Sequence, residues 1–166
     1  MTSKTAAPRK KFGIIHPRDA QHMTGLEFLQ AIRDGDLPSP PMAQALDFEL
    51  TEVERGRAVF TGSPDARFYN PIGSVHGGYA ATLLDSAMGV AIHSLLEAGQ
   101  AYTTVEIKIN FVRPITDATG QTRAEAKVIS IGKRLATAEG RLTDSNGKLL
   151  AHGTATCMIL QLDRKE

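Results

Sequence analysis

The sequence has one cysteine, no tryptophan and no large excess of charge of either sign. A single cysteine excludes a disulfide framework within the chain and suits a reducing cytoplasm, where we expect the protein to reside. Because Cys157 lies in the apolar run TATCMIL, we expect a buried thiol rather than a nucleophile. The formal net charge of +1 at pH 7 gives no reason to expect nucleic acid as a partner.

Long apolar runs are also scarce. The longest, GYAATLLDSAMGVAIHSLL, covers residues 78–96 and is near the length of about 20 residues that a membrane-spanning helix needs. It contains five polar or ionisable residues: Thr82, Asp85, Ser86, His93 and Ser94. We therefore expect no membrane span. The polar, basic N-terminus lacks the apolar segment of a signal peptide.

The length of 166 residues suits one domain of ordinary size. Residues 1–41 are expected to form an N-terminal extension, with a short amphipathic helix over about 24–34 and a Pro-rich connector at 38–41. Thr24 has the features of the N-cap of that helix. Residues 42–162 are expected to form the main domain.

The rest of the sequence predicts a long helix among strands. The helix is expected from Gly77 to Ala98, with Gly99 ending it. The expected strands are 47–53, 57–62, 104–111, 121–131, 134–143 and 148–161. Short turns between strands favour antiparallel pairing. The predicted fold class is therefore α+β, with one long central helix wrapped by a curved antiparallel sheet of five to six strands.

The strand 104–111 has a strict alternation. Val105, Ile107, Ile109 and Phe111 are expected on one face, and Thr104 on the other face with the remaining polar residues.

Asp85 is the most informative residue, because it is a lone carboxylate on an otherwise apolar helix. Burying an unpaired charge is costly, so something must hold this group. A carboxylate in such a place is a candidate catalytic acid or base. The alternative is a structural carboxylate bonded to Thr82, Ser86 or a partner.

A second signal precedes it. The segment from Asn70 to Gly78 ends in His76-Gly77-Gly78, where the long helix should begin. Two glycines there expose backbone N–H groups at the positive end of the helix dipole, which favours a bound oxyanion. The alternative is that these residues only cap the helix.

The string Asn70-x5-His76-Gly77-Gly78-x6-Asp85 resembles the hotdog-fold acyl-CoA thioesterases, and most closely their PaaI-type (phenylacetate-pathway) branch. The resemblance covers about residues 42–161 and extends to VRP, GKR and HGTATCMIL near the C-terminus. It implies hydrolysis of acyl-CoA thioesters to a free acid and coenzyme A. It also implies homotetramers built from hotdog dimers, no metal and no cofactor apart from the coenzyme A of the substrate.

The resemblance also implies roles for residues. The Gly77 N–H would polarise the thioester carbonyl, helped by the Asn70 side chain, and Asp85 would act as general base or nucleophile. A hydroxyl would help to position the attacking water. Thr104 is the expected residue, with Thr103 as the substitute.

Five further residues are candidates for catalysis or substrate binding. His76 is expected to orient the Asn70 side chain or to lie near the leaving sulfur, unless it only caps the helix. Gly78 is expected to contact the substrate. Coenzyme A carries phosphates, for which Lys133, Arg134 and Arg113 are the candidate partners.

Helix geometry adds one constraint. Gly77 and Asp85 are eight residues apart, which corresponds to about 12 Å along a helix axis. Both cannot contact one carbonyl carbon from the same chain, so a shared site between two subunits is expected. Two other functions remain open: a hotdog acyl-CoA hydratase, and a non-catalytic acyl-CoA binding module.

Overall fold

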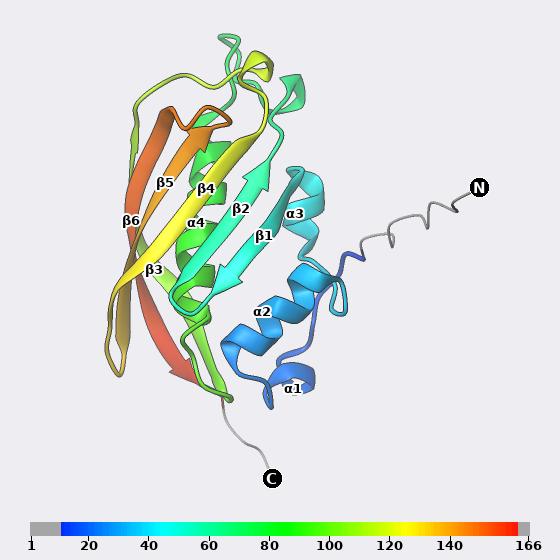
Figure 1. Cartoon of the computed structure of the whole chain (residues 1–166), viewed down its shortest axis with the longest axis vertical. Coiled ribbons are helices and arrows are strands. Elements are labelled where there is room, and N and C mark those ends of the chain that lie inside the picture. Colours follow the sequence, from blue (N-terminus) through cyan, green and yellow to red (C-terminus); the bar gives the residue numbers. More distant parts are fainter. Residues whose placement is uncertain (1–10, 163–166) are drawn as a thin grey trace, which may run out of the picture.

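A computed structural model describes residues 11–162, so the part of the predicted extension before residue 11 lies outside the described residues (Figure 1). The helices are α1 (Pro17–Ala20), α2 (Gly25–Asp34), α3 (Pro41–Ala45) and α4 (Gly77–His93). The strands are β1 (Phe48–Glu54), β2 (Arg57–Gly62), β3 (Gln100–Phe111), β4 (Thr122–Ile131), β5 (Leu135–Asp144) and β6 (Leu149–Gln161).

The six strands form one antiparallel sheet in the order β1-β2-β4-β5-β6-β3. The sheet curves around α4, and α2 lies beside β1 (Figure 1). Bulges in β1, β3, β4 and β6 bend the strands, as bulges do. The predicted α+β fold, a central helix wrapped by a curved antiparallel sheet, is confirmed, and it is the hotdog arrangement.

The sheet accommodates α4 by presenting small residues to it. The inner face carries alanines that are almost fully buried: Ala124, Ala126, Ala136, Ala138, Ala151 and Ala155. The helix supplies the bulk, with Leu83, Leu84, Met88 and Ile92 completely buried. Gly140 is needed for this fit, because a Cβ there would lie 3.1 Å from both Leu84 and Met88. Close packing of large against small side chains is what holds a core together.

The helix α4 ends at His93, five residues before the predicted end at Ala98. After His93 the chain tightens into shorter-range turns, with the Leu96 N–H donating to the His93 carbonyl. The start of α2 packs on the same place, because the Gly25 N–H donates to the Leu96 carbonyl at 2.9 Å. A tertiary contact therefore ends this helix, where the sequence alone predicted Gly99 as the stop.

The strand β3 also differs from the predicted alternation. It has a bulge between Thr104 and Glu106, and an extra residue in a strand reverses which side chains face inward. Thr104 pairs with Cys157, and Ile109 pairs with Gly153, so both lie on the helix side of the sheet. The prediction that Thr104 lies on the face opposite to Ile109 was wrong.

The extension packs against this frame. The helix α2 begins with Thr24 as N-cap, as predicted, and Gly35 ends it at a φ of 86°. The Pro-rich connector pairs with the N-terminal segment through a parallel bridge between Phe12 and Ser39, and Pro41 then opens α3. Within residues 11–162, no helix is long and apolar enough to cross a membrane.

Candidate active site

Asp85 lies halfway along α4, partly buried, and faces β3. The Thr104 hydroxyl donates a hydrogen bond to Asp85 Oδ1 at 3.0 Å. Thr104 faces the helix because the bulge begins only after it. Its side chain therefore keeps the inward direction set by the first part of β3. Thr103, the substitute candidate, pairs with Met158, is exposed and faces away from the helix.

Neither neighbouring hydroxyl on α4 holds this carboxylate. The Thr82 hydroxyl donates to the Gly78 carbonyl at 2.9 Å instead. Among the described residues, Thr104 is the hydrogen-bond partner found for Asp85, and its second oxygen has none. Such an oxygen can accept a proton or attack a carbon.

The first turn of α4 presents one open backbone donor. His76 is the N-cap, and its Nδ1 accepts a hydrogen bond from the Gly78 N–H at 2.9 Å. The Gly77 N–H, by contrast, has no acceptor anywhere in residues 11–162. Phe111 covers this turn, because a Cβ on Gly77 would lie 3.2 Å from its ring. A helix start with an open N–H is suited to a developing oxyanion.

Asn70 organises the loop that leads to this turn. Its Oδ1 accepts from the Ile72 and Ser74 N–H groups at 3.0 and 3.3 Å, and its Nδ2 donates to the Ser74 hydroxyl at 3.0 Å. An amide nitrogen has two N–H donors, so one is left for another acceptor. Within the described chain no hydrogen bond joins Asn70 to His76.

Comparison with known proteins places the chain in a family. A sequence model of the thioesterase superfamily matches residues 72–151. A thioesterase family protein from Silicibacter pomeroyi is 31% identical, with a TM-score of 0.68, over 73% of this chain and 90% of that one. The chain belongs to the thioesterase superfamily.

Two further proteins support the assignment of this thioesterase. A phenylacetic acid degradation-related protein from Ralstonia eutropha has 28% identity and a TM-score of 0.72, covering 79% of this chain and 98% of that one. The 1,4-dihydroxy-2-naphthoyl-CoA hydrolase of Listeria monocytogenes is 26% identical over 71% of this chain and 94% of its own length. Together these similarities support a thioester hydrolase of the PaaI-like type.

The three basic candidates of the thioesterase do not form one patch. Arg113 lines the hollow at the start of α4 that Gly77 and Phe111 share, and it donates to the Leu149 carbonyl. Arg134 lies at the β4–β5 turn with Lys133, where its carbonyl accepts from Ile159. The two places are about 33 Å apart along β6, from Leu149 to Ile159.

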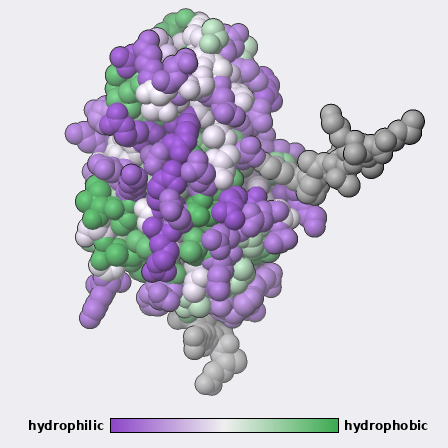
Figure 2. Space-filling view, in the orientation of Figure 1, coloured by the Kyte–Doolittle hydropathy of each residue, from purple (hydrophilic) through white to green (hydrophobic). Residues whose placement is uncertain are grey.

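Other charges on the sheet surface bind one another. Arg57 forms ion pairs with Glu52, Glu54 and Glu125, and Arg123 binds Glu125 as well. Hydrogen bonds donated by Arg57 and Arg123 lower the pKa of Glu125 to about 2. A hydrophilic band crosses the face on which β1, β2 and β4 are seen (Figure 2). These side chains are therefore structural rather than free to bind a phosphate.

Tyr102, which lies near Asp85, was not identified from the sequence. Tyr102 lies across Gly89, where a Cβ would be only 2.6 Å from its hydroxyl oxygen, and its ring centroid is 5.4 Å from that of His93. Burial, and then the nearby Cys157 and Asp85, raise the pKa of the Tyr102 hydroxyl. The sequence signal for this region is the spacing on α4, where residues 85, 89 and 93 recur every four residues on one helix face.

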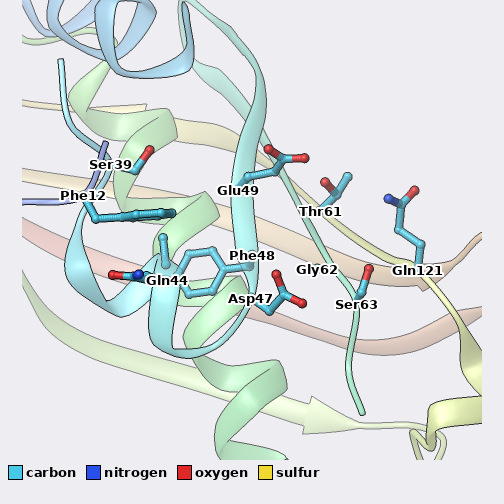
Figure 3. A pocket seen from close by; sticks show the side chains of 11 residues that line it. Phe12, Ser39, Gln44, Asp47, Phe48, Glu49, Thr61, Gly62, Ser63 and Gln121 are labelled. Carbon is cyan, nitrogen blue, oxygen red and sulfur yellow. The ribbon is translucent and has the colours of Figure 1, made fainter. Parts of the chain in front are cut away.

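A polar hollow elsewhere on the thioesterase does not reach Asp85. It is lined by residues of the extension, including Phe12 and Ser39, and by the ends of β1 and β2, including Asp47 and Ser63 (Figure 3). In residues 11–162 no group of three or more His, Cys, Asp or Glu side chains could hold a metal ion.

Proposed function

We propose that this thioesterase hydrolyses acyl-CoA thioesters to a free acid and coenzyme A. The observation that carries the proposal is the Asp85 carboxylate, which stands alone on an apolar helix and is oriented by the Thr104 hydroxyl at 3.0 Å. The name of the Listeria monocytogenes relative adds support, because it describes a hydrolase of a CoA thioester. An open Gly77 N–H supplies the other group that acyl transfer needs.

In the proposed reaction, water attacks the thioester carbonyl carbon while Asp85 accepts a proton from it. The carbonyl oxygen becomes an oxyanion that the Gly77 N–H stabilises, with the free Asn70 N–H as a second donor. The carbon–sulfur bond then breaks, and the sulfur leaves with the proton that Asp85 returns. Thr104 positions the carboxylate and the attacking water.

Asp85 could also attack the carbon directly, forming a mixed anhydride that water then cleaves. Repeated turnover in ¹⁸O-labelled water tests for this route. Water that attacks the aspartyl carbonyl of the anhydride leaves ¹⁸O in the Asp85 carboxylate, whereas the general-base route leaves that carboxylate unlabelled.

The site is proposed to need two chains. Gly77 and Asp85 are about 12 Å apart along α4, too far for both to contact one carbonyl group. The edge strand β3 carries unpaired backbone groups, and Ile107 and Phe111 on its inner face are 39% and 59% exposed. A second copy against β3 would cover these side chains and bring its own Gly77 toward Asp85.

Replacing Asp85 by Asn tests the proposed activity. We expect Asp85→Asn to lower turnover at least about 100-fold while circular dichroism stays unchanged, because a general base or nucleophile is lost. Release of free thiol from a panel of acyl-CoAs is the measurement. The control is Asp36→Asn, which changes an exposed carboxylate between α2 and α3. Near-normal turnover by Asp85→Asn would contradict the assignment.

Mixing two inactive variants tests the shared site. Gly77→Pro removes the open N–H at a helix position that tolerates proline. A heterodimer of Gly77→Pro with Asp85→Asn has one site with both defects and one intact site. Random exchange makes half the dimers mixed, so about a quarter of wild-type activity should return. Mass spectrometry confirms the exchange, and heterodimers without activity would show that the two residues act within one chain or that the proposed roles are wrong.

A further inference from the structure

An apolar cavity of about 330 Å³ lies under the N-terminal extension, beside α4. The extension forms its outer wall with α2, the Pro-rich connector and the segment around Ile15. Its inner wall is formed by Leu50, Phe60 and Val90 of the main domain. Cavities of this size and composition bind small molecules or apolar parts of them.

One face of α4 links this cavity to Asp85. His93 lines the cavity and lies on the same helix face as Asp85, two turns away, with Gly89 between them. Tyr102 also lines the cavity, and its ring covers the gap that Gly89 leaves. Asp85 and Val90 are about 8 Å apart along the helix axis, a distance that an acyl chain of medium length spans.

The lining carries little charge. His93 is the only histidine in it, and burial lowers its pKa to about 4, so the imidazole is neutral at pH 7. Glu49 is the one carboxylate of the lining, and it also lines the polar hollow beyond Ser39, which places it at the boundary of the two. Among the lining residues described, none has a basic side chain that would attract an acidic acyl group.

We propose that the extension and α4 together form the acyl-binding cavity of this thioesterase, and that it selects uncharged apolar acyl groups of medium length or one aromatic ring. The proposal rests on the proposed acyl-CoA hydrolysis. The outer wall, formed by the extension and the start of α3, ends at Ala43, whereas the family match begins at residue 72, so this wall lies outside the matched region. The extension is therefore the specificity-determining segment.

Apolar burial should make the rate depend on chain length. Each methylene that enters the cavity favours binding about fourfold, which follows from the transfer of one CH₂ out of water. The wild-type enzyme should therefore show kcat/KM rising steeply from acetyl-CoA to octanoyl-CoA, until the cavity is full. A succinyl group, which ends in a carboxylate, should be a poor substrate.

The test fills the cavity from the side of the extension. Ile32→Trp places a larger side chain in the outer wall. We expect kcat/KM for octanoyl-CoA to fall at least about 10-fold, since two or more methylenes lose their site, while acetyl-CoA changes less than about twofold. The control is Met42→Trp on α3, an exposed residue directly after the extension that does not line the cavity.

Equal losses for all chain lengths, or no loss for octanoyl-CoA, would overturn the proposal. If Ile32→Trp does not fold, Val90→Phe fills the cavity from the α4 side and must give the same selective loss. Calorimetric titration of octanoate into each protein separates the two proposals. If the wild type binds octanoate and Ile32→Trp does not, the acyl-binding cavity is supported even if no acyl-CoA is hydrolysed. If Ile32→Trp hydrolyses acyl-CoAs of every chain length as the wild type does, the cavity proposal is refuted and the proposed hydrolysis stands.

Discussion

His93 should make the stability of this thioesterase depend on pH in the mildly acidic range. Its imidazole lies between the rings of Phe28 and Tyr102, each with centroids 5.4 Å away. Burial lowers its pKa from 6.5 to about 4, because the charged form loses its hydration. The unfolded chain then binds the proton more readily than the folded one, so stability is complete above pH 6.5 and falls as the pH drops toward 4.

The magnitude follows from this pair of pKa values. Between pH 7.5 and pH 5 the unfolded histidine becomes almost fully protonated, whereas the folded one stays mostly neutral. The difference lowers the free energy of unfolding by about 2 kcal/mol, since each unit of pKa difference is worth about 1.4 kcal/mol. Carboxylates such as Glu125, whose pKa falls from 4.5 to about 2, lose their stabilisation at lower pH than this window.

Urea unfolding at a fixed protein concentration measures the effect. The wild-type protein is compared with His93→Phe, which keeps a ring between Phe28 and Tyr102 and cannot titrate. Between pH 7.5 and pH 5, His93→Phe should lose about 2 kcal/mol less of its free energy of unfolding than the wild type. Equal losses in both proteins would show that His93 is not a buried neutral imidazole, and would refute the reasoning.

Two further predictions concern the candidate site. Thr104→Val removes the hydrogen bond to Asp85. Turnover in steady-state assays should fall at least about 10-fold, because a hydrogen bond to a charged group is worth about 1.5–3 kcal/mol. Thr104→Ser, which keeps the hydroxyl, should retain most of the activity. Asn70→Asp keeps the oxygen that accepts from Ile72 and Ser74 but loses the amide donor, so turnover should fall about 100-fold with the loop still protected from proteolysis. Normal turnover of Asn70→Asp would restrict Asn70 to organising the loop.

Local sequence signals determined the helices and strands and many of the residues at which they begin and end. The capping pair of Thr24 with Glu27, the left-handed Gly35 and the turn at Gly147 are all decided by interactions within a few residues, so they are visible in the sequence. The apolar character of residues 78–96 required a helix covered on most sides, and the six predicted strands supplied the cover.

The sequence also identified the chemistry of the site without its contacts. Asp85 is conspicuous as a charge on an apolar helix, and the glycines before it mark the helix start. Which hydroxyl holds Asp85 depends on the bulge after Thr104, because one extra residue in β3 changes the face of every later side chain. A bulge is set by pairing with β6, which lies more than 40 residues away in the chain.

Only the tertiary structure decided where α4 ends and what lies beyond Asp85. The helix stops at His93 because the start of α2, far earlier in the sequence, packs on its last turn. The same contact brings the extension over Val90 and His93 and encloses the apolar cavity. Periodicity and caps act within one segment, whereas a cavity belongs to surfaces that meet only when the chain has folded, so the sequence by itself could show the carboxylate but not the space beside it.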